Sequence, residues 1–180
     1  MQTIETRHPD FAREVRERSG TALDRCYQCL TCSLGCPVAP DMDYMPNQVI
    51  RMVQLGLKDQ VLSSGTIWLC ATCETCVARC PNDVDVLRVM DTLREMALEQ
   101  GAPTPQPQIP IFHRTSLESI KLWGRQHELS MILLLKLRSR DLFSDLLMGV
   151  KMILKGKLKI VPQRIKGLKD ITAIFQRVQG

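Results

Sequence analysis

Apolar residues recur at helical spacing in several separate segments, and residues 1–100 contain no useful alternation of apolar and polar positions of the kind a strand shows. A helix is predicted to begin at Pro46, because proline suits the first helical turn. Its apolar side consists of Val49, Ile50, Val53 and Leu57. Residues 10–18 are rich in charge and predict a short surface helix. This half of the chain is therefore expected to be largely α-helical.

A second, longer helix is predicted to follow Asp83 or Asp85, either of which can cap its N-terminus, and to end near Gly101. Its predicted buried side consists of Val86, Val89, Met90, Leu93, Met96 and Ala97.

Residues 102–110 contain four prolines and predict an extended linker between two parts of the chain. Helices are predicted again at about 112–124, 128–138 and 141–155. The expected organisation is a cysteine-bearing domain at 1–101, the linker at 102–110 and a helical extension at 111–180. In the last helix a broad apolar stripe is formed by Leu142, Phe143, Leu146, Leu147, Val150, Ile153 and Leu154.

Charge divides the chain in the same way. Residues 1–100 carry ten Lys and Arg against fourteen Asp and Glu, whereas residues 101–180 carry fourteen against five. The segment from Lys151 to Lys169 holds seven basic residues and no acidic one. A basic helical segment of this kind suits docking on a protein partner, contact with a membrane surface or packing on its own domain.

Composition narrows the class of protein. Apolar residues make up 44% of the chain and charged residues 24%, as in a globular protein, while 4% aromatics argue against a stacking platform for nucleic acid. The longest apolar run, Met131 to Leu135, is too short to cross a bilayer. No secretory signal is recognisable at the start, so a cytoplasmic location is expected.

The eight cysteines form two copies of one motif. Cys26 to Pro37 and Cys70 to Pro81 both read C-x2-C-x2-C-x3-C-P, and the copies align without a gap at an offset of 44 residues. This spacing is that of bacterial ferredoxins with two [4Fe–4S] clusters. Every cysteine of the chain belongs to a copy.

Cysteines two residues apart can wrap one corner of an iron–sulfur cube, because the backbone between them turns around it and presents N–H groups to the sulfur atoms. In such motifs the fourth cysteine, followed by proline, binds the other cluster. The predicted ligands of the first cluster are Cys26, Cys29, Cys32 and Cys80. Those of the second cluster are Cys70, Cys73, Cys76 and Cys36. The fold expected is a mainly α, helical ferredoxin domain with two [4Fe–4S] clusters and a basic helical extension.

Other interpretations of the cysteines fit less well. A disulfide framework suits a small secreted chain, structural zinc sites group their ligands as two pairs, and haem attachment needs a histidine after the second cysteine. Trp68 and Leu69, just before Cys70, either shield a cluster from water or pack in the core. His8, His113 and His127 stand alone and are not expected to be ligands or catalysts.

The doubled motif resembles the C subunits of heterodisulfide reductases. The resemblance extends to the spacer from Pro46 to Arg51, to the sequence Trp68-Leu69-Cys70, and, for bacterial members, to Phe112-His113-Arg114 and the region from Lys155 to Leu158. It implies an electron relay between an A-type partner, which carries flavin and clusters, and a B-type partner, which reduces a disulfide on clusters bound by CCG motifs. This chain has no adjacent cysteine pair, so it lacks the chemistry of the B-type partner.

Three functions are compatible with these features. The leading hypothesis is a relay protein of a heterodisulfide reductase-like complex with A-like and B-like partners and no catalytic residue of its own. The alternative is an iron–sulfur adaptor of a membrane-associated, quinone-linked reductase, docked through its basic half. A third is a sensor that responds to cluster loss. Neither the terminal substrate nor the direction of electron flow follows from the sequence.

Overall fold

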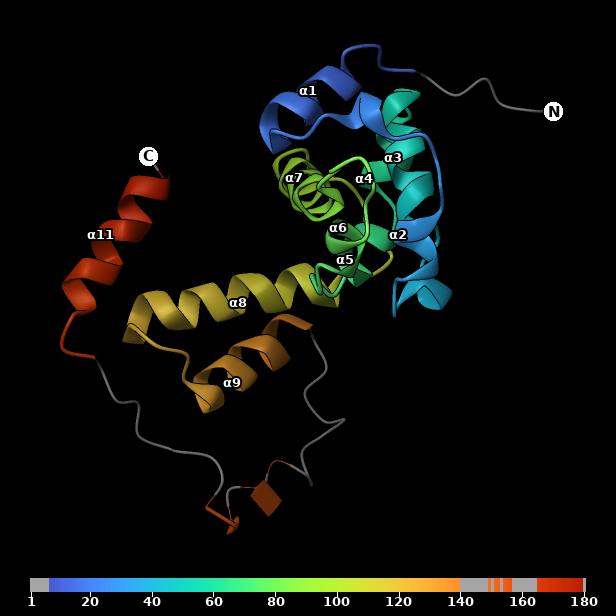
Figure 1. Cartoon of the computed structure of the whole chain (residues 1–180). Helices are drawn as coiled ribbons and strands as arrows, with labels where there is room; N and C mark the ends of the chain where they lie inside the picture. The colour runs from blue at the N-terminus through green and yellow to red at the C-terminus, as the bar shows by residue number, and fades with distance from the viewer. Residues whose placement is uncertain (1–6, 140–148, 150, 153, 157–164, 180) are drawn as a thin grey trace. The chain divides into compact units, whose positions relative to one another are not determined.

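The computed structural model describes residues 7–139, 149, 151–152, 154–156 and 165–179. The described residues form helices and turns without any strand, which confirms the mainly α prediction. The chain divides into two compact units, Met1–Gln106 and Pro107–Gly180, and each unit is described by itself (Figure 1).

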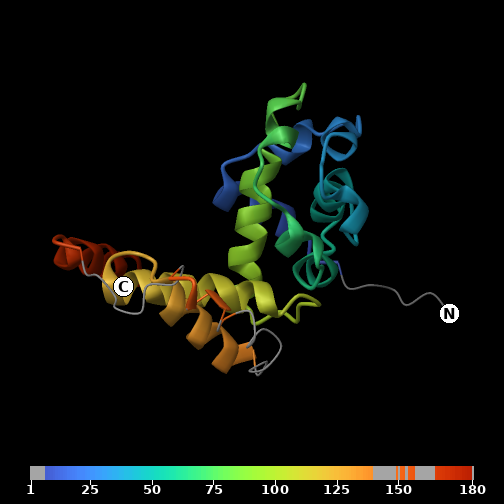
Figure 2. The same ribbon diagram turned by 90° about the horizontal axis from the view of Figure 1, so that it is seen from below.

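Unit 1 contains every cysteine and is built from short helices around one long helix (Figure 2). Its elements are α1 (Phe11–Ser19), η1 (Leu23–Arg25), α2 (Thr31–Leu34), η2 (Ala39–Asp41), α3 (Pro46–Gln54), α4 (Lys58–Leu62), α5 (Thr66–Leu69), α6 (Thr75–Ala78) and α7 (Val86–Glu99).

The long helix α7 organises this unit. Asp85, one of the two predicted caps, lies at its N-terminus and accepts a hydrogen bond from the Arg88 backbone N–H at 2.9 Å. All six residues of the predicted apolar side are buried, and α7 packs against α1, α3, α4, α5 and α6. Full burial of such side chains contributes about 1.5–3 kcal/mol each, so this helix carries much of the stability of the unit.

Helix α3 also follows the prediction. Pro46 occupies its first turn, and Val49, Ile50 and Val53 are buried. The helix ends at Gln54, earlier than Leu57, which instead precedes α4. The chain turns at Gly56, where φ is +74° and where any Cβ would lie 2.6 Å from the carbonyl oxygen of His8. Only glycine fits this turn.

The first helix differs from the prediction of a surface helix. Phe11 and Val15, four residues apart, are fully buried, and α1 packs against α3 and α7. At its C-terminal end Arg18 donates two hydrogen bonds, of 2.7 and 2.6 Å, to the carboxylate of Glu99. The charges predicted for the surface therefore surround an apolar edge that belongs to the core.

Unit 2 contains α8 (Gln108–Trp123), α9 (Glu128–Ser139) and α11 (Leu168–Gln179). Helices α8 and α9 agree with the prediction, except that α8 begins earlier, so the last residues of the predicted linker are helical. Thr115 and Ser119 are buried on α8, and the Ser119 hydroxyl accepts the His127 backbone N–H at 3.1 Å. Helix α11 was missed, and the predicted helix at 141–155 lies largely outside the described residues.

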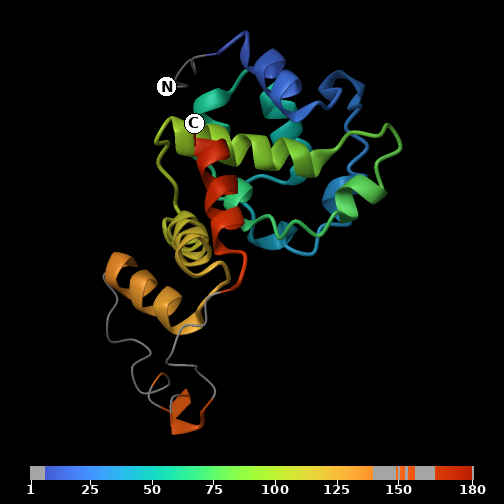
Figure 3. The ribbon, with the colours of Figure 1, turned by 90° about the vertical axis from the view of Figure 1, so that its left-hand side faces the viewer.

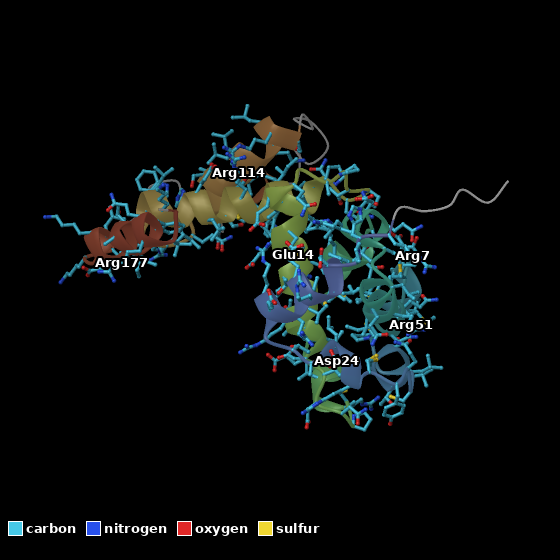
Figure 4. The ribbon with its side chains drawn as sticks, turned by 90° about the horizontal axis from the view of Figure 1, so that it is seen from above. Arg7, Glu14, Asp24, Arg51, Arg114 and Arg177 are labelled. Carbon is cyan, nitrogen blue, oxygen red and sulfur yellow. The ribbon has the colours of Figure 1, made fainter. Side chains whose placement is uncertain are left out.

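Charged side chains lie on the outside of both units, as Asp24 and Arg51 show in unit 1 and Arg114 and Arg177 in unit 2 (Figure 4). None of the helices in the described part of the chain combines the length and the apolar character that a membrane span requires.

Candidate iron–sulfur centres

The two cysteine motifs share an unusual backbone. Gln28 and Leu30 flank Cys29 with φ values of +64° and +66°, and Thr72 and Glu74 flank Cys73 with +52° and +59°. Positive φ is uncommon for residues other than glycine and concentrates at functional sites. Left-handed residues that alternate with ordinary ones turn successive N–H groups to one side and create an anion-binding loop. The repeat in the sequence is thus a repeat in the backbone.

The second cysteine of each motif lies beside a threonine hydroxyl. Sγ of Cys29 is 3.3 Å from Oγ1 of Thr31, and Sγ of Cys73 is 3.4 Å from Oγ1 of Thr75. Hydrogen bonds from these threonines lower the pKa of both thiols, which favours the thiolate that iron binds. Both cysteines are exposed, so each motif presents one ligand to the surroundings.

The third cysteine of each motif is half-buried in a short helix, Cys32 in α2 and Cys76 in α6, and these helices pack side by side (Figure 3). Burial raises the pKa of Cys32, and it raises the pKa of Cys76 to about 11, with smaller contributions from Cys70 and Cys32. Ligation must therefore displace protons from these thiols. The influence of Cys32 on Cys76 also shows that the two motifs are neighbours.

The fourth cysteine of the first motif lies with the second motif. Cys36 lines a pocket together with Cys70, Cys73 and Cys76, which is the predicted ligand set of the second cluster. The rest of the lining is provided by Val38, Met42, Pro46, Ala71, Thr72, Glu74, Thr75, Val86, Leu87 and Met90. Apolar side chains from the segment around η2 and from α3 and α7 thus cover the back of this pocket, where they limit access of water.

The fourth cysteine of the second motif lies with the first. Partial desolvation raises the pKa of Tyr27, and the charges of Cys29 and Cys80 add to the rise, so Cys80 is close to the residue that follows Cys26. Two residues after Cys80, Nδ2 of Asn82 donates to the Arg25 carbonyl oxygen at 2.5 Å. The Val84 N–H donates to Sγ of Cys80 at 3.3 Å. The two motifs are interleaved at both of their ends.

Arg94 of α7 fixes the entry to the second motif. Its guanidinium donates to the carbonyl oxygens of Ile67 and Cys70, the latter at 2.5 Å, and to the carboxylate of Asp91 at 2.9 Å. Two carbonyls at the end of α5 are thereby satisfied. Neither Arg94 nor Asn82 was identified from the sequence, because nothing in a sequence pattern marks a side chain that bonds to a distant backbone carbonyl.

Trp68 fits core packing better than shielding of the pocket. It is buried, with 5% of its surface exposed, but it does not belong to the pocket lining. His8, His113 and His127 lie outside both cysteine groups, and the ring of His8 contacts Asp59 at 3.5 Å.

The arrangement suits a cofactor larger than one metal ion. In the described residues no three Cys, His, Asp or Glu side chains come together as a single ion requires. Four thiolates around zinc, each about 2.3 Å from the metal, lie only about 3.8 Å apart. Cysteine ligands spread around a pocket, with positive-φ loops that present N–H groups, match an iron–sulfur cube.

Comparison with known proteins agrees with this geometry. Residues 22–84 match the family of 4Fe-4S dicluster domains. The site and fold thus define a helical two-cluster ferredoxin domain, and the cofactors are two [4Fe–4S] clusters. The resemblance to the C subunits of heterodisulfide reductases is confirmed by curated relatives of that name.

Three relatives illustrate the similarity. The chain is 35% identical over 96 residues to the C subunit of the H(2):CoB-CoM heterodisulfide,ferredoxin reductase of Methanothermobacter marburgensis, which is 53% of this chain and 52% of the relative. It is 44% identical over 85 residues to the C2 subunit of the H(2)/formate:CoB-CoM heterodisulfide,ferredoxin reductase of Methanococcus maripaludis (47% and 46%). For the second iron-sulfur C subunit of the CoB--CoM heterodisulfide reductase of Methanocaldococcus jannaschii, the values are 45% over 80 residues, 44% and 42%. The matches span about half the length of these relatives.

Proposed function

We propose that the chain is the electron relay of a heterodisulfide reductase-like complex, between an A-like partner with flavin and clusters and a B-like partner that reduces a disulfide. The observation that carries the proposal is the exposure of Cys29 and Cys73, one in each motif, while Cys32 and Cys76 lie on adjoining helices. A relay requires this arrangement, with two outward edges for exchange and a short path between them.

The ligand assignment is part of this proposal. Cys26, Cys29, Cys32 and Cys80 hold cluster 1, and Cys70, Cys73, Cys76 and Cys36 hold cluster 2. The pocket shared by Cys36 and the second motif supports the second set. The contact of Asn82 with Arg25 supports the first. When bound, each cluster accepts and releases one electron at a time, and the chain positions it and excludes water.

The surroundings of the two motifs differ, as two different partners would require. Cys26 opens onto a groove that includes Arg13, Arg16 and Arg51. Arg13 and Arg16 pair with neighbouring carboxylates, at 2.8 Å in the case of Arg13 and Asp10, whereas Arg51 bonds to the neutral Gln54. The second motif instead presents Glu74 beside its pocket. Electrostatic complementarity of this kind selects partners and orients them.

The experiment is electron transfer through the assembled complex. The anaerobically purified chain is expected to contain eight iron and eight sulfide atoms, four of each per cluster, and to lack disulfide reductase activity alone. Added to the A-like and B-like partners, it is expected to restore turnover. A Cys29→Ser variant should lose most of this restoration, whereas a variant with an unrelated surface change, Arg88→Gln, should keep it. Disulfide reduction by the isolated chain would overturn the proposal. The cytoplasmic location stays a prediction.

A further inference from the structure

A chain of hydrogen bonds leads from a buried serine to a ligand of cluster 1. The Ser33 hydroxyl donates to Oδ1 of Asn47 at 2.6 Å, and Nδ2 of Asn47 donates to Oε1 of Gln28 at 3.1 Å. Nε2 of Gln28 then donates to Sγ of Cys26 at 3.4 Å. Side chains from α2, from the first turn of α3 and from the cysteine loop thus act in series.

The direction of each bond in the chain is fixed. The Ser33 hydroxyl accepts the backbone N–H of Asn47 at 3.1 Å, so its own proton is available for Oδ1 of Asn47. The amide of Asn47 consequently turns its N–H toward Gln28, and Gln28 turns its N–H toward Cys26. Ser33 and Asn47 are only 4% and 7% exposed, so water does not compete for these groups. The chain ends in a donor aimed at the sulfur.

The second motif has no equivalent of this chain. With the offset of 44 residues, Thr72 occupies the place of Gln28 and Val77 that of Ser33. Valine has no polar group, and the threonine side chain is shorter than that of glutamine. The two clusters therefore differ in the hydrogen bonds that their ligands receive, although the backbone of the two loops is alike.

We propose that Ser33 and Asn47 position Gln28 to raise the reduction potential of cluster 1 above that of cluster 2, so that the electron in transit rests on cluster 1. A donor to a thiolate ligand stabilises the reduced cluster more than the oxidised one, because the reduced cluster carries one more negative charge. The inference rests on the ligand assignment in the proposed function. Gln28 acts on the cluster through Cys26, and the other two act through Gln28.

The test is a redox titration of the anaerobic holoprotein, with the signal of each cluster followed by EPR. Gln28→Leu should lower the potential of cluster 1 by about 59 mV, which corresponds to a tenfold change in the ratio of reduced to oxidised cluster. The potential of cluster 2 should be unchanged. Thr72→Leu, the matched change in the second motif, should move neither potential by a comparable amount.

Asn47→Asp tests positioning with little change in volume. The carboxylate cannot donate to Oε1 of Gln28, so the Gln28 amide turns over and presents oxygen to Cys26. The potential of cluster 1 should fall, and the fall should shrink by more than half in a Gln28→Leu background. A fall of equal size in that background would show that the charge of the introduced carboxylate, rather than Gln28, is responsible.

The outcomes separate the inference from the proposed function. Two full clusters with unmoved potentials in Gln28→Leu would overturn the inference alone. Equal shifts of both clusters would also overturn it, since they would indicate a general change of the unit. Failure of the wild-type chain to hold both clusters would overturn the proposed function. If Gln28→Leu fails to assemble, Asn47→Asp and Ser33→Ala, which keep the glutamine, provide the same readout.

Discussion

The side chain of Arg79 lies over the backbone of Gly35, and each is the residue before the fourth cysteine of its motif. A Cβ at Gly35 would lie 2.7 Å from Nη1 and 3.1 Å from Cδ of Arg79, and 3.3 Å from the carbonyl oxygen of Thr31. Equivalent positions of the repeat thus meet where α2 packs on α6, and glycine on one side makes room for arginine on the other.

Gly35→Ala should therefore destabilise the junction of the motifs. The added methyl group overlaps Arg79, and overpacking of this kind costs about 1–3 kcal/mol. The measurement is the temperature at which cluster absorbance is lost on anaerobic heating. Gly35→Ala with Arg79→Ala should recover part of the loss, but not all, because the Thr31 carbonyl stays close. An unchanged temperature in Gly35→Ala would contradict this account.

The crossed ligation predicts which variants share a defect. Cys36→Ser should weaken cluster 2 and resemble Cys73→Ser in its EPR spectrum, because both remove ligands of the same cluster. Cys80→Ser should instead resemble Cys29→Ser. If Cys36→Ser grouped with Cys29→Ser, each motif would hold its own cluster and the assignment would be wrong.

Arg94 should matter for cluster 2 more than for cluster 1. Arg94→Gln removes donors from the carbonyls of Ile67 and Cys70, and each buried acceptor left unpaired costs about 1–3 kcal/mol. Occupancy of cluster 2 should fall severalfold, as measured by spin quantitation of the two EPR signals. Arg88→Gln on the exposed side of α7 is the control and should leave both signals intact. Equal loss of both clusters in Arg94→Gln would refute the local role.

In unit 2 a pH-dependent contact joins α8 to α9. Nη1 of Arg138 lies 2.7 Å from the carboxylate of Glu118, and this hydrogen bond holds the pKa of Glu118 below its usual value. The stabilisation is therefore present above the ordinary carboxyl pKa of about 4.3 and is lost as the pH falls through the lowered pKa. An NMR titration of the Glu118 carboxyl carbon should show a higher midpoint in Arg138→Met. Equal midpoints would show that the pair is not formed in solution.

Periodicity was sufficient to predict α3 and α7, because each buries one apolar face that repeats in the sequence. It was insufficient for α1, whose contribution to the core is mainly Phe11 and Val15 among charged residues. Helices α5 and α6 are each four residues long, too short for a repeating pattern to reveal them. The motifs predicted all eight cysteines and their cofactor. They gave no sign of Asn47, Asn82 or Arg94, since each of these residues acts through a contact distant in sequence.

The hydrophobic core of unit 1 contains no cysteine, while the loops that carry the cysteines hold four non-glycine residues at positive φ. Such conformations cost roughly 1 kcal/mol each without compensation. Chelation of the iron should therefore release the two loops and leave the body of α1, α3 and α7 standing. Repair after oxidative damage then becomes a local event, in which a spent cofactor is exchanged at one tip of a scaffold that never has to refold.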